Sequence, residues 1–205
     1  MTDAALPLAA AGAAAPAAER TSTGLNSRKL LFWSFIGSEC MFFGSLIATY
    51  MVYRGRDTTG PFPHDVFDIP LTSYSALILL VSSLTMVLAL SAVQRGDRRR
   101  APLWLAATAL LGVHFLANQA WEFTHFVEKG LKLQTNLFSC SFYVLTGFHG
   151  THVLVGTIWL WSLFTLAVRG KLPPGRALDV EVAGLYWHFV DVVWIAIFTL
   201  VYLIH

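Results

Sequence analysis

Two histidines three residues apart lie in one of the most apolar parts of this chain, in the stretch GFHGTHV at residues 147–153. On a helix, residues i and i+3 occupy neighbouring positions of one face, so His149 and His152 would point in related directions. Ionisable side chains inside apolar segments are costly and need partners. The pair could bind a metal ion, ligate a haem, relay a proton, or hydrogen-bond between helices.

Carboxylates accompany histidines at the same spacing elsewhere in the chain, as Glu122 with His125 and as His188 with Asp191. Each such pair could hydrogen-bond within its own helix or reach a neighbouring helix. A further acid, Glu39, lies about 14 Å along its apolar segment at 1.5 Å per residue, near the middle of a membrane. A carboxyl group there is either protonated or paired with a cation, and it could serve as a proton site or as a structural hydrogen-bond donor.

Three kinds of chemistry remain open on spacing alone. A metal site needs three or four converging ligands; His149 and His152 supply two, and Glu39 or His188 could add more. A haem b site would use one histidine from each of two helices, and His114 is a further candidate, but no spacing selects a pair. A proton path needs polar stations at graded depths, and few lie between Glu39 and either surface.

The elements that would position these residues are five apolar segments, each long enough to cross a bilayer, which takes about 20 residues. Hydrophobic residues make up 56% of the 205 residues and charged residues only 13%, whereas soluble domains carry about a quarter charged residues. The net charge of +2 and the lack of a basic block argue against a nucleic-acid partner. We therefore predict an all-α integral membrane bundle of five transmembrane helices, over residues 30–53, 71–93, 102–126, 138–168 and 182–204.

The distribution of positive charge predicts the orientation of this bundle. Ten Lys and Arg residues fall in the N-terminal segment and in the second and fourth loops, against four in the other loops. By the positive-inside rule the N-terminus is cytoplasmic and the C-terminus lies on the outer side. Trp33 and Tyr202, near span ends, are expected in the aromatic belts at the membrane interfaces.

Two features outside the histidine pattern carry structural expectations. Residues 1–28 are rich in Ala and Pro and lack a basic start, so we predict a disordered cytoplasmic tail rather than a signal peptide, with residues 29–205 as the transmembrane domain. Cys40 and Cys140 belong to no CxxC pair or Cys/His cluster. We expect both to be small buried hydrophobic residues.

Six stretches, in one order, carry a family resemblance. They are SECMFFGSLIATY, FDIPLTS, RGDRRR, NQAWEFTHF, TGFHGTHVLVG and YWHFVDVVWIAIFTLVYL, between residues 38 and 203. In this order they resemble subunit III of the haem–copper oxidases, the cytochrome c oxidase subunit III family. The resemblance runs from about residue 30 to the C-terminus, and the set is highly specific.

The resemblance implies a cofactor-free accessory subunit of an aerobic respiratory terminal oxidase, a cytochrome c oxidase of the aa3 or caa3 kind. Haems and copper belong to subunits I and II, so no catalytic centre is expected in this chain. The family member packs on subunit I beside subunit II and binds phospholipid in a cleft. It supports proton uptake and protects the active site while O2 is reduced to water. The implied location is the bacterial plasma membrane, where the complex could also join a respiratory supercomplex.

The resemblance also leaves alternatives. Longer members have seven spans, whereas this chain resembles the bacterial five-span form, which lacks the two helices that form one wall of the lipid cleft. Glu39 in SEC favours the cytochrome c branch over the quinol oxidase and nitric-oxide-reductase-associated branches. A hypothesis from a different functional class is an independent membrane ion carrier with Glu39 as its ion site. The sequence shows neither an internal repeat nor a series of polar residues along a span that would support it.

The family's intramembrane carboxylate corresponds to Glu39, its paired histidines to His149 and His152, and its Trp-His-Phe-x-Asp motif includes His188 and Asp191. Either His149 or His152 is expected to face the first span and pair with Glu39, with neighbouring glycines at 147, 150 and 156 allowing the close approach. The residues expected to form an intramembrane polar seam, with a lipid cleft, are Glu39, Glu122, His125, His149, His152, His188 and Asp191.

Overall fold

The computed structural model describes residues 27–54 and 68–204, and within these residues every regular element is helical. The predicted tail falls mostly outside this part, although its last residues, Ser27 and Arg28, already belong to the first helix. Five long helices are present, and each is long and apolar enough to cross a membrane. They are α1 (Ser27–Tyr53), α3 (Ile69–Gln94), α4 (Arg100–Glu128), α5 (Leu137–Val168) and α6 (Ala177–Ile197). A 3-10 turn, η2 (Pro174–Arg176), precedes α6, and a π-helical turn, η3 (Phe198–Leu203), follows it.

Helix ends follow local sequence signals. Asp68 caps α3 by accepting a hydrogen bond from the backbone N–H of Leu71, and Asn136 caps α5 by accepting one from Ser139. The helices α3, α4 and α5 each end near a glycine with positive φ, a conformation that costs glycine no steric strain. These glycines are Gly96, Gly130 and Gly170.

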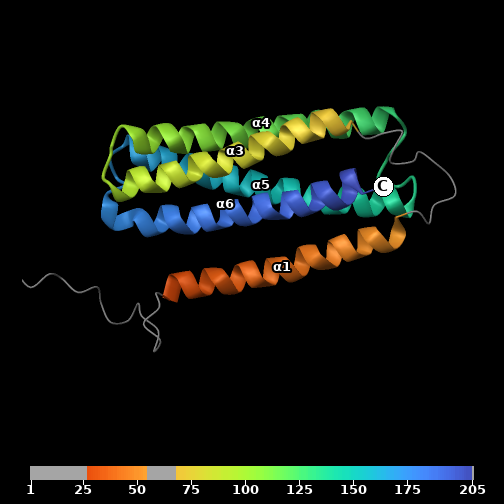
Figure 1. Ribbon diagram of the computed structural model, residues 1–205, viewed down its shortest axis with the longest axis horizontal. Coiled ribbons are helices and arrows are strands. Elements are labelled where there is room, and N and C mark those ends of the chain that lie inside the picture. Colours follow the sequence, from red (N-terminus) through yellow and green to blue (C-terminus); the bar gives the residue numbers. More distant parts are fainter. Residues whose placement is uncertain (1–26, 55–67, 205) are drawn as a thin grey trace, which may run out of the picture.

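The five predicted spans are confirmed: every helix begins before its expected first residue, and the expected last residues are met to within two residues when η3 is counted with α6. The largest difference is at the fifth span, because α6 begins at Ala177 and not at residue 182. The start of α1 and the loops α3–α4 and α5–α6, which carry most of the basic residues, lie at one end of the molecule (Figure 1). This arrangement agrees with the charge pattern, and the cytoplasmic assignment of that end stays a prediction.

The helices α3 to α6 pack into a bundle, and α1 lies alongside it against α5 and α6 (Figure 1). Only Phe43 and Tyr50 of α1 are buried, whereas α6 contributes a dense row of buried residues. The core therefore lies among α3, α4, α5 and α6, and α1 is held at its edge.

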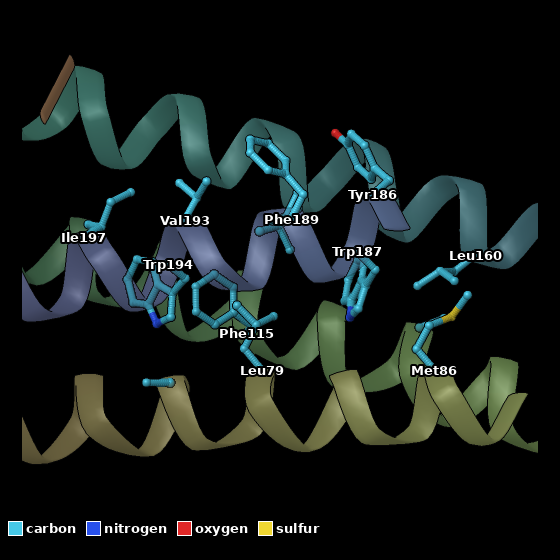
Figure 2. Packing of buried hydrophobic residues seen from close by; sticks show 14 of the residues in the cluster. Leu79, Met86, Phe115, Leu160, Tyr186, Trp187, Phe189, Val193, Trp194 and Ile197 are labelled. Atoms are coloured by element: carbon cyan, nitrogen blue, oxygen red, sulfur yellow. The ribbon is translucent and has the colours of Figure 1, made fainter. Parts of the chain in front are cut away.

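Trp187 of α6 is one of the largest fully buried side chains of this core (Figure 2). Its ring fills a slot between Gly112 of α4 and Gly156 of α5, where an added Cβ would come within 2.6 and 2.9 Å of ring atoms. Its indole N–H donates a hydrogen bond to the Ser82 hydroxyl of α3 at 2.9 Å. One residue thus fixes the spacing of all four bundle helices.

Two expectations about single residues were wrong. Cys40 and Cys140 are exposed, not buried, because the outer surface of a membrane bundle is itself apolar and accepts small hydrophobic side chains. Tyr202 is buried in the core, 6.2 Å from the ring of Phe142, and does not join an interfacial belt. Tyr202 lies in the π-helical turn η3. Trp33, by contrast, is exposed as expected.

Candidate functional site

Glu39 of α1 and His152 of α5 meet between the two helices. Glu39 Oε2 and His152 Nε2 lie 3.2 Å apart, and the two side chains are only 18% and 17% exposed. The distance is that of an ion pair, although the angles do not meet those of a hydrogen bond. The other ring nitrogen of His152 donates its Nδ1–H to the carbonyl oxygen of Phe148, one turn earlier, at 2.7 Å.

This arrangement determines which ring nitrogen of His152 faces the acid. A carbonyl oxygen only accepts, so Nδ1 of His152 keeps its proton and Nε2 is the nitrogen that faces Glu39. With one proton between Oε2 and Nε2, the pair is neutral overall, whether it is written as acid and imidazole or as carboxylate and imidazolium. Overall neutrality avoids the cost of a lone charge within the membrane.

An apolar groove with a volume of ≈ 520 Å³ opens beside the pair. Its walls are mainly aromatic, and the hydroxyl of Tyr186 donates to the backbone carbonyl of His152 at 3.1 Å. The groove residues are Phe32, Phe35, Glu39, Thr151, His152, Val155, Trp159 and Tyr186.

A second groove, of ≈ 450 Å³, lies toward the start of α1 and shares Phe32 and Trp159 with the first. Its walls include Arg28, Arg176 and Asp179. Arg176 contacts Asp179 at 2.8 Å, and Arg28 lies 3.9 Å from the same carboxylate. The two grooves adjoin along α1 and α5 at Phe32 and Trp159, and we call the two together the α1–α5 channel. Arg28 and Arg176 lie on the second groove and the Glu39–His152 pair on the first.

His149 does not reach Glu39. Its buried ring donates Nε2–H to the carbonyl oxygen of Val190 on α6 at 3.2 Å and stacks against Trp194 with 4.9 Å between ring centroids. The expected contact with Glu39 is therefore made by His152 alone, and His149 joins α5 to α6.

The Glu122 and His125 side chains also have different partners. Glu122 is buried and accepts a 2.7 Å hydrogen bond from the hydroxyl of Thr72 on α3. His125 stacks on Trp121 with planes 9° apart and lies 3.6 Å from Glu128. Of the two, Glu122 joins helices, while His125 lies near the end of α4.

His188 and Asp191 of α6 both turn toward α3. The Nδ1 atom of His188 lies 2.9 Å from the hydroxyl of Ser83, which also interacts with the Asp191 carboxylate. The second oxygen of Asp191, Oδ1, is buried without a hydrogen-bond partner. Sequence reasoning missed both hydroxyl partners, Thr72 and Ser83, because a Ser or Thr on a helix is as often bonded to its own backbone.

The glycines do not have the role expected of them. Gly150 faces Gln119 of α4, Gly156 faces Trp187 and Tyr186 of α6, and nothing lies within 4 Å of an added Cβ at Gly147. They admit side chains from α4 and α6 and not the backbone of α1. The faces of α5 that carry Gly150 and Gly156 thus point into the bundle, while His152 points toward α1.

The seven residues singled out in the sequence occupy four places: the Glu39–His152 pair, the contact of His149 with α6, the region around Glu122 and His125, and the cluster at Ser83. Within residues 27–54 and 68–204, no group of three or more His, Cys, Asp or Glu side chains is arranged to hold a metal ion. The chemistry that this geometry supports is proton sharing at Glu39 beside an apolar channel.

A family model for cytochrome c oxidase subunit III matches residues 17–205. The chain is 40% identical to cytochrome c oxidase subunit 3 of Bacillus sp. (strain PS3) over 190 residues, 92% of each chain. It is 38% identical to quinol oxidase subunit 3 of Bacillus subtilis (strain 168) over 190 residues, again 92% of each chain. Cytochrome bo(3) ubiquinol oxidase subunit 3 of Pseudomonas putida is 36% identical over 173 residues, 84% of each chain.

Proposed function

The chain belongs to the cytochrome c oxidase subunit III family, and from this premise we propose that it is a cofactor-free accessory subunit of a cytochrome c oxidase in a bacterial plasma membrane. Membership in the family makes it a multi-pass membrane protein and part of a multi-subunit oxidase complex with subunit I. In the proposal it packs on subunit I beside subunit II. It supports proton uptake and the durability of the active site during reduction of O2 to water.

The observation that carries the proposal is the match over nearly the whole chain. The position of Glu39 supports the role in proton uptake, because its carboxyl group lies 3.2 Å from His152 Nε2 near the middle of α1 and lines a groove. An independent ion carrier would need further polar stations along this groove. Its other walls are mainly aromatic and aliphatic.

Purification through a tag on this chain tests the proposal directly. We expect haem- and copper-containing subunits to co-purify. The oxidase without this chain should begin turnover at a normal rate and then lose activity progressively as turnover continues, whereas the complete complex keeps its activity. A purified single chain with a stoichiometric Soret band would contradict the cofactor-free assignment. Proton flux through the isolated chain in vesicles, abolished by Glu39→Gln, would favour the carrier instead.

The electron donor is the finer part of the proposal. The two Bacillus relatives, one named a cytochrome c oxidase subunit and the other a quinol oxidase subunit, are almost equally similar to this chain. The preference for cytochrome c as electron donor therefore rests on Glu39 in the stretch SEC. Oxygen consumption by the purified complex with reduced cytochrome c, and not with a quinol, is the expected result. The opposite preference would assign the chain to a quinol oxidase.

We also propose that the channel between α1 and α5 holds a phospholipid, with acyl chains against Phe32 and Trp159 and the headgroup near Arg28 and Arg176. Both arginines share Asp179, which keeps them at the mouth of the groove. Arg28→Gln with Arg176→Gln should lower the phospholipid that co-purifies with the complex, measured by mass spectrometry. Lys129→Gln with Lys132→Gln, in the loop before α5, is the charge-matched control.

A further inference from the structure

A histidine faces outward at the middle of α4. His114 lies midway between Arg100 and Glu128, so about 21 Å of helix separates it from each end at 1.5 Å per residue. The hydrocarbon core of a bilayer reaches only about 15 Å to either side of its centre. The exposed side chain of His114 therefore lies where there is neither water nor a hydrogen-bonding lipid group.

The other histidines of the helix interiors have hydrogen-bond or ion-pair partners within the protein. His149 bonds the carbonyl of Val190, His152 meets Glu39, and His188 bonds Ser83. In the described part of the chain no hydrogen bond reaches either ring nitrogen of His114. Its contact is an edge-to-face approach to the ring of Tyr74 on α3, with 6.0 Å between ring centroids.

Other exposed polar residues in the spans satisfy themselves. The hydroxyls of Ser38 and Ser45 on α1, for example, donate to carbonyls of their own helix at 2.7 Å. Such residues are compatible with a lipid-facing position. His114 is not satisfied in this way, which sets it apart from the ordinary polar residues of these faces.

Further polar groups extend the surface around His114 toward one end of α4. Asn118 and Trp121 follow it at i+4 and i+7, hence on the same helix face. Asn118 donates to the hydroxyl of Ser75 at 3.2 Å, while Trp121 is 59% and Tyr74 53% exposed. We call Tyr74, His114, Asn118 and Trp121 the α3–α4 polar face. The helices that carry it, α3 and α4, lie across the bundle from α1 (Figure 1).

We propose that the α3–α4 polar face docks against a membrane-spanning helix of oxidase subunit I, which forms a hydrogen bond with the imidazole of His114. The identity of the partner rests on the proposed function. A lipid tail cannot supply that bond, whereas a neighbouring helix with a hydroxyl, carboxyl or free carbonyl group can. The face is separate from the α1–α5 channel, so docking leaves the channel open to lipid.

A photo-crosslinking amino acid at Ala117, exposed on the same face of α4, tests the docking in the assembled complex in its native membrane. The control probe is placed at Ile158, which is exposed on α5. We expect Ala117 to crosslink to subunit I and Ile158 to crosslink mainly to lipid. A product at Ala117 that contains only lipid, or a second copy of this chain, would overturn the proposal.

Substitution of His114 tests the hydrogen bond. His114→Leu should lower retention of this chain on detergent-purified subunit I about threefold, the factor that corresponds to an average interhelical hydrogen bond. His114→Gln, which keeps a hydrogen-bonding group, should restore retention, and Ser45→Leu on α1 should leave it unchanged. Unchanged retention with His114→Leu would show that the face meets lipid.

These experiments separate the two proposals. If the complex co-purifies and subunit I crosslinks through Ile158 rather than Ala117, the docking face is wrong and the proposed function stands. If the tagged chain does not co-purify with haem-containing subunits, both fail.

Discussion

The Glu39–His152 pair is an acid and a base that satisfy each other where water is excluded. Glu39 alone would have to be protonated, and His152 alone would have to be neutral, since a single charge at that depth is costly. Their facing atoms lie 3.2 Å apart, and Nδ1 of His152 is fixed by the carbonyl of Phe148. Removing either side chain leaves the other partly buried without its partner, so a substitution of one residue reports on the contact between the two.

Glu39→Ala should leave electron transfer in the complex nearly unchanged and destabilise the chain. The substitution leaves His152 Nε2 partly buried without a partner, a loss of about 1–3 kcal/mol. Ser38→Ala is the control, because the Ser38 hydroxyl is exposed and bonds only its own helix. Thermal unfolding in detergent and oxygen consumption by the complex give the two readouts. Loss of haem from the complex with Glu39→Ala would mean that this residue has another role.

A second buried carboxyl group gives a sharper stability test. Thr72→Val removes the hydroxyl that donates to Glu122 at 2.7 Å and keeps nearly the same volume. We expect a loss of about 1–3 kcal/mol, because the buried carboxyl group is left unsatisfied. Thr124→Val, at an exposed hydroxyl that bonds the carbonyl of Ala120, should change stability by less than about 0.5 kcal/mol. Equal effects would show that the Thr72 bond contributes nothing specific.

For single residues, the sequence predicts which side chains need a partner better than it predicts which residue that partner is. Glu39 in an apolar segment demands a partner, and the i, i+3 histidines offer one, so the contact could be foreseen. Which histidine makes it depends on the rotation of α5 about its axis, and that is set by packing against α4 and α6. The rotations of α1 and α5 about their axes also decide which way Cys40 and Cys140 face, so their exposure could not be deduced from their apolar neighbours.

Among the elements, the contact of α6 with α4 and α5 depends on two glycines. Gly112→Ala or Gly156→Ala should destabilise the chain by about 1–3 kcal/mol, because an added methyl group meets the ring of Trp187, which is held on three sides. Gly44→Ala on α1 has open space around its Cβ and is the matched control. Its expected effect is neutral or slightly stabilising, since alanine favours helix. Unfolding temperatures of the purified variants decide between these outcomes.

The turn between α3 and α4 predicts a pH dependence. Hydrogen bonds to the Asp97 carboxylate from the backbone N–H groups of Arg100, first, and Arg99 lower the pKa of Asp97 below its usual value. Because the pKa is lower in the folded chain, ionised Asp97 stabilises the fold above the unfolded-state pKa of about 3.9. This contribution is lost as the pH falls through the folded-state pKa.

The stability difference between wild type and Asp97→Ala should therefore stay constant from neutral pH to about pH 5 and shrink below about pH 4. Asp97→Asn, which keeps an acceptor without the charge, should have a stability between wild type and Asp97→Ala at neutral pH, and its difference from Asp97→Ala should change little with pH. Unfolding temperatures measured across this pH range provide the test. A wild-type advantage over Asp97→Ala that grew in acid would reverse the assigned sign.

Helix positions were easier to predict than helix contacts. Length and hydropathy are enough to identify five spans, and Asp68, Asn136 and the loop glycines mark their ends. Which helices lie side by side depends on how their side chains fit together, for example on the fit of the Trp187 ring between Gly112 and Gly156. A single sequence does not state which glycine faces which ring.

On the scale of the whole molecule, α3 to α6 form a well-buried core, and α1 packs against it with few buried side chains. Helix α1 buries few side chains and lines both grooves, and its polar contacts with the bundle include Lys29–Glu181 and Glu39–His152. A loosely attached wall suits a channel that takes up lipid, since the wall can move without disturbing the core. The α3–α4 polar face belongs to the firm side, where a fixed surface favours docking.

This difference in burial predicts that α1 unfolds locally more often than α3, although the two helices have nearly the same length. In detergent, the backbone amides of α1 (27 residues) should exchange hydrogen at least about tenfold faster than those of α3 (26 residues). Glu39→Ala should widen the difference, because it removes one of the contacts that hold α1 to α5, while Gly156→Ala should accelerate exchange in α5 and α6. Hydrogen exchange read by mass spectrometry resolves the helices. Uniform protection of α1 and α3, unaltered by Glu39→Ala, would mean that α1 is an integral part of the core and that lipid must enter the channel by another route.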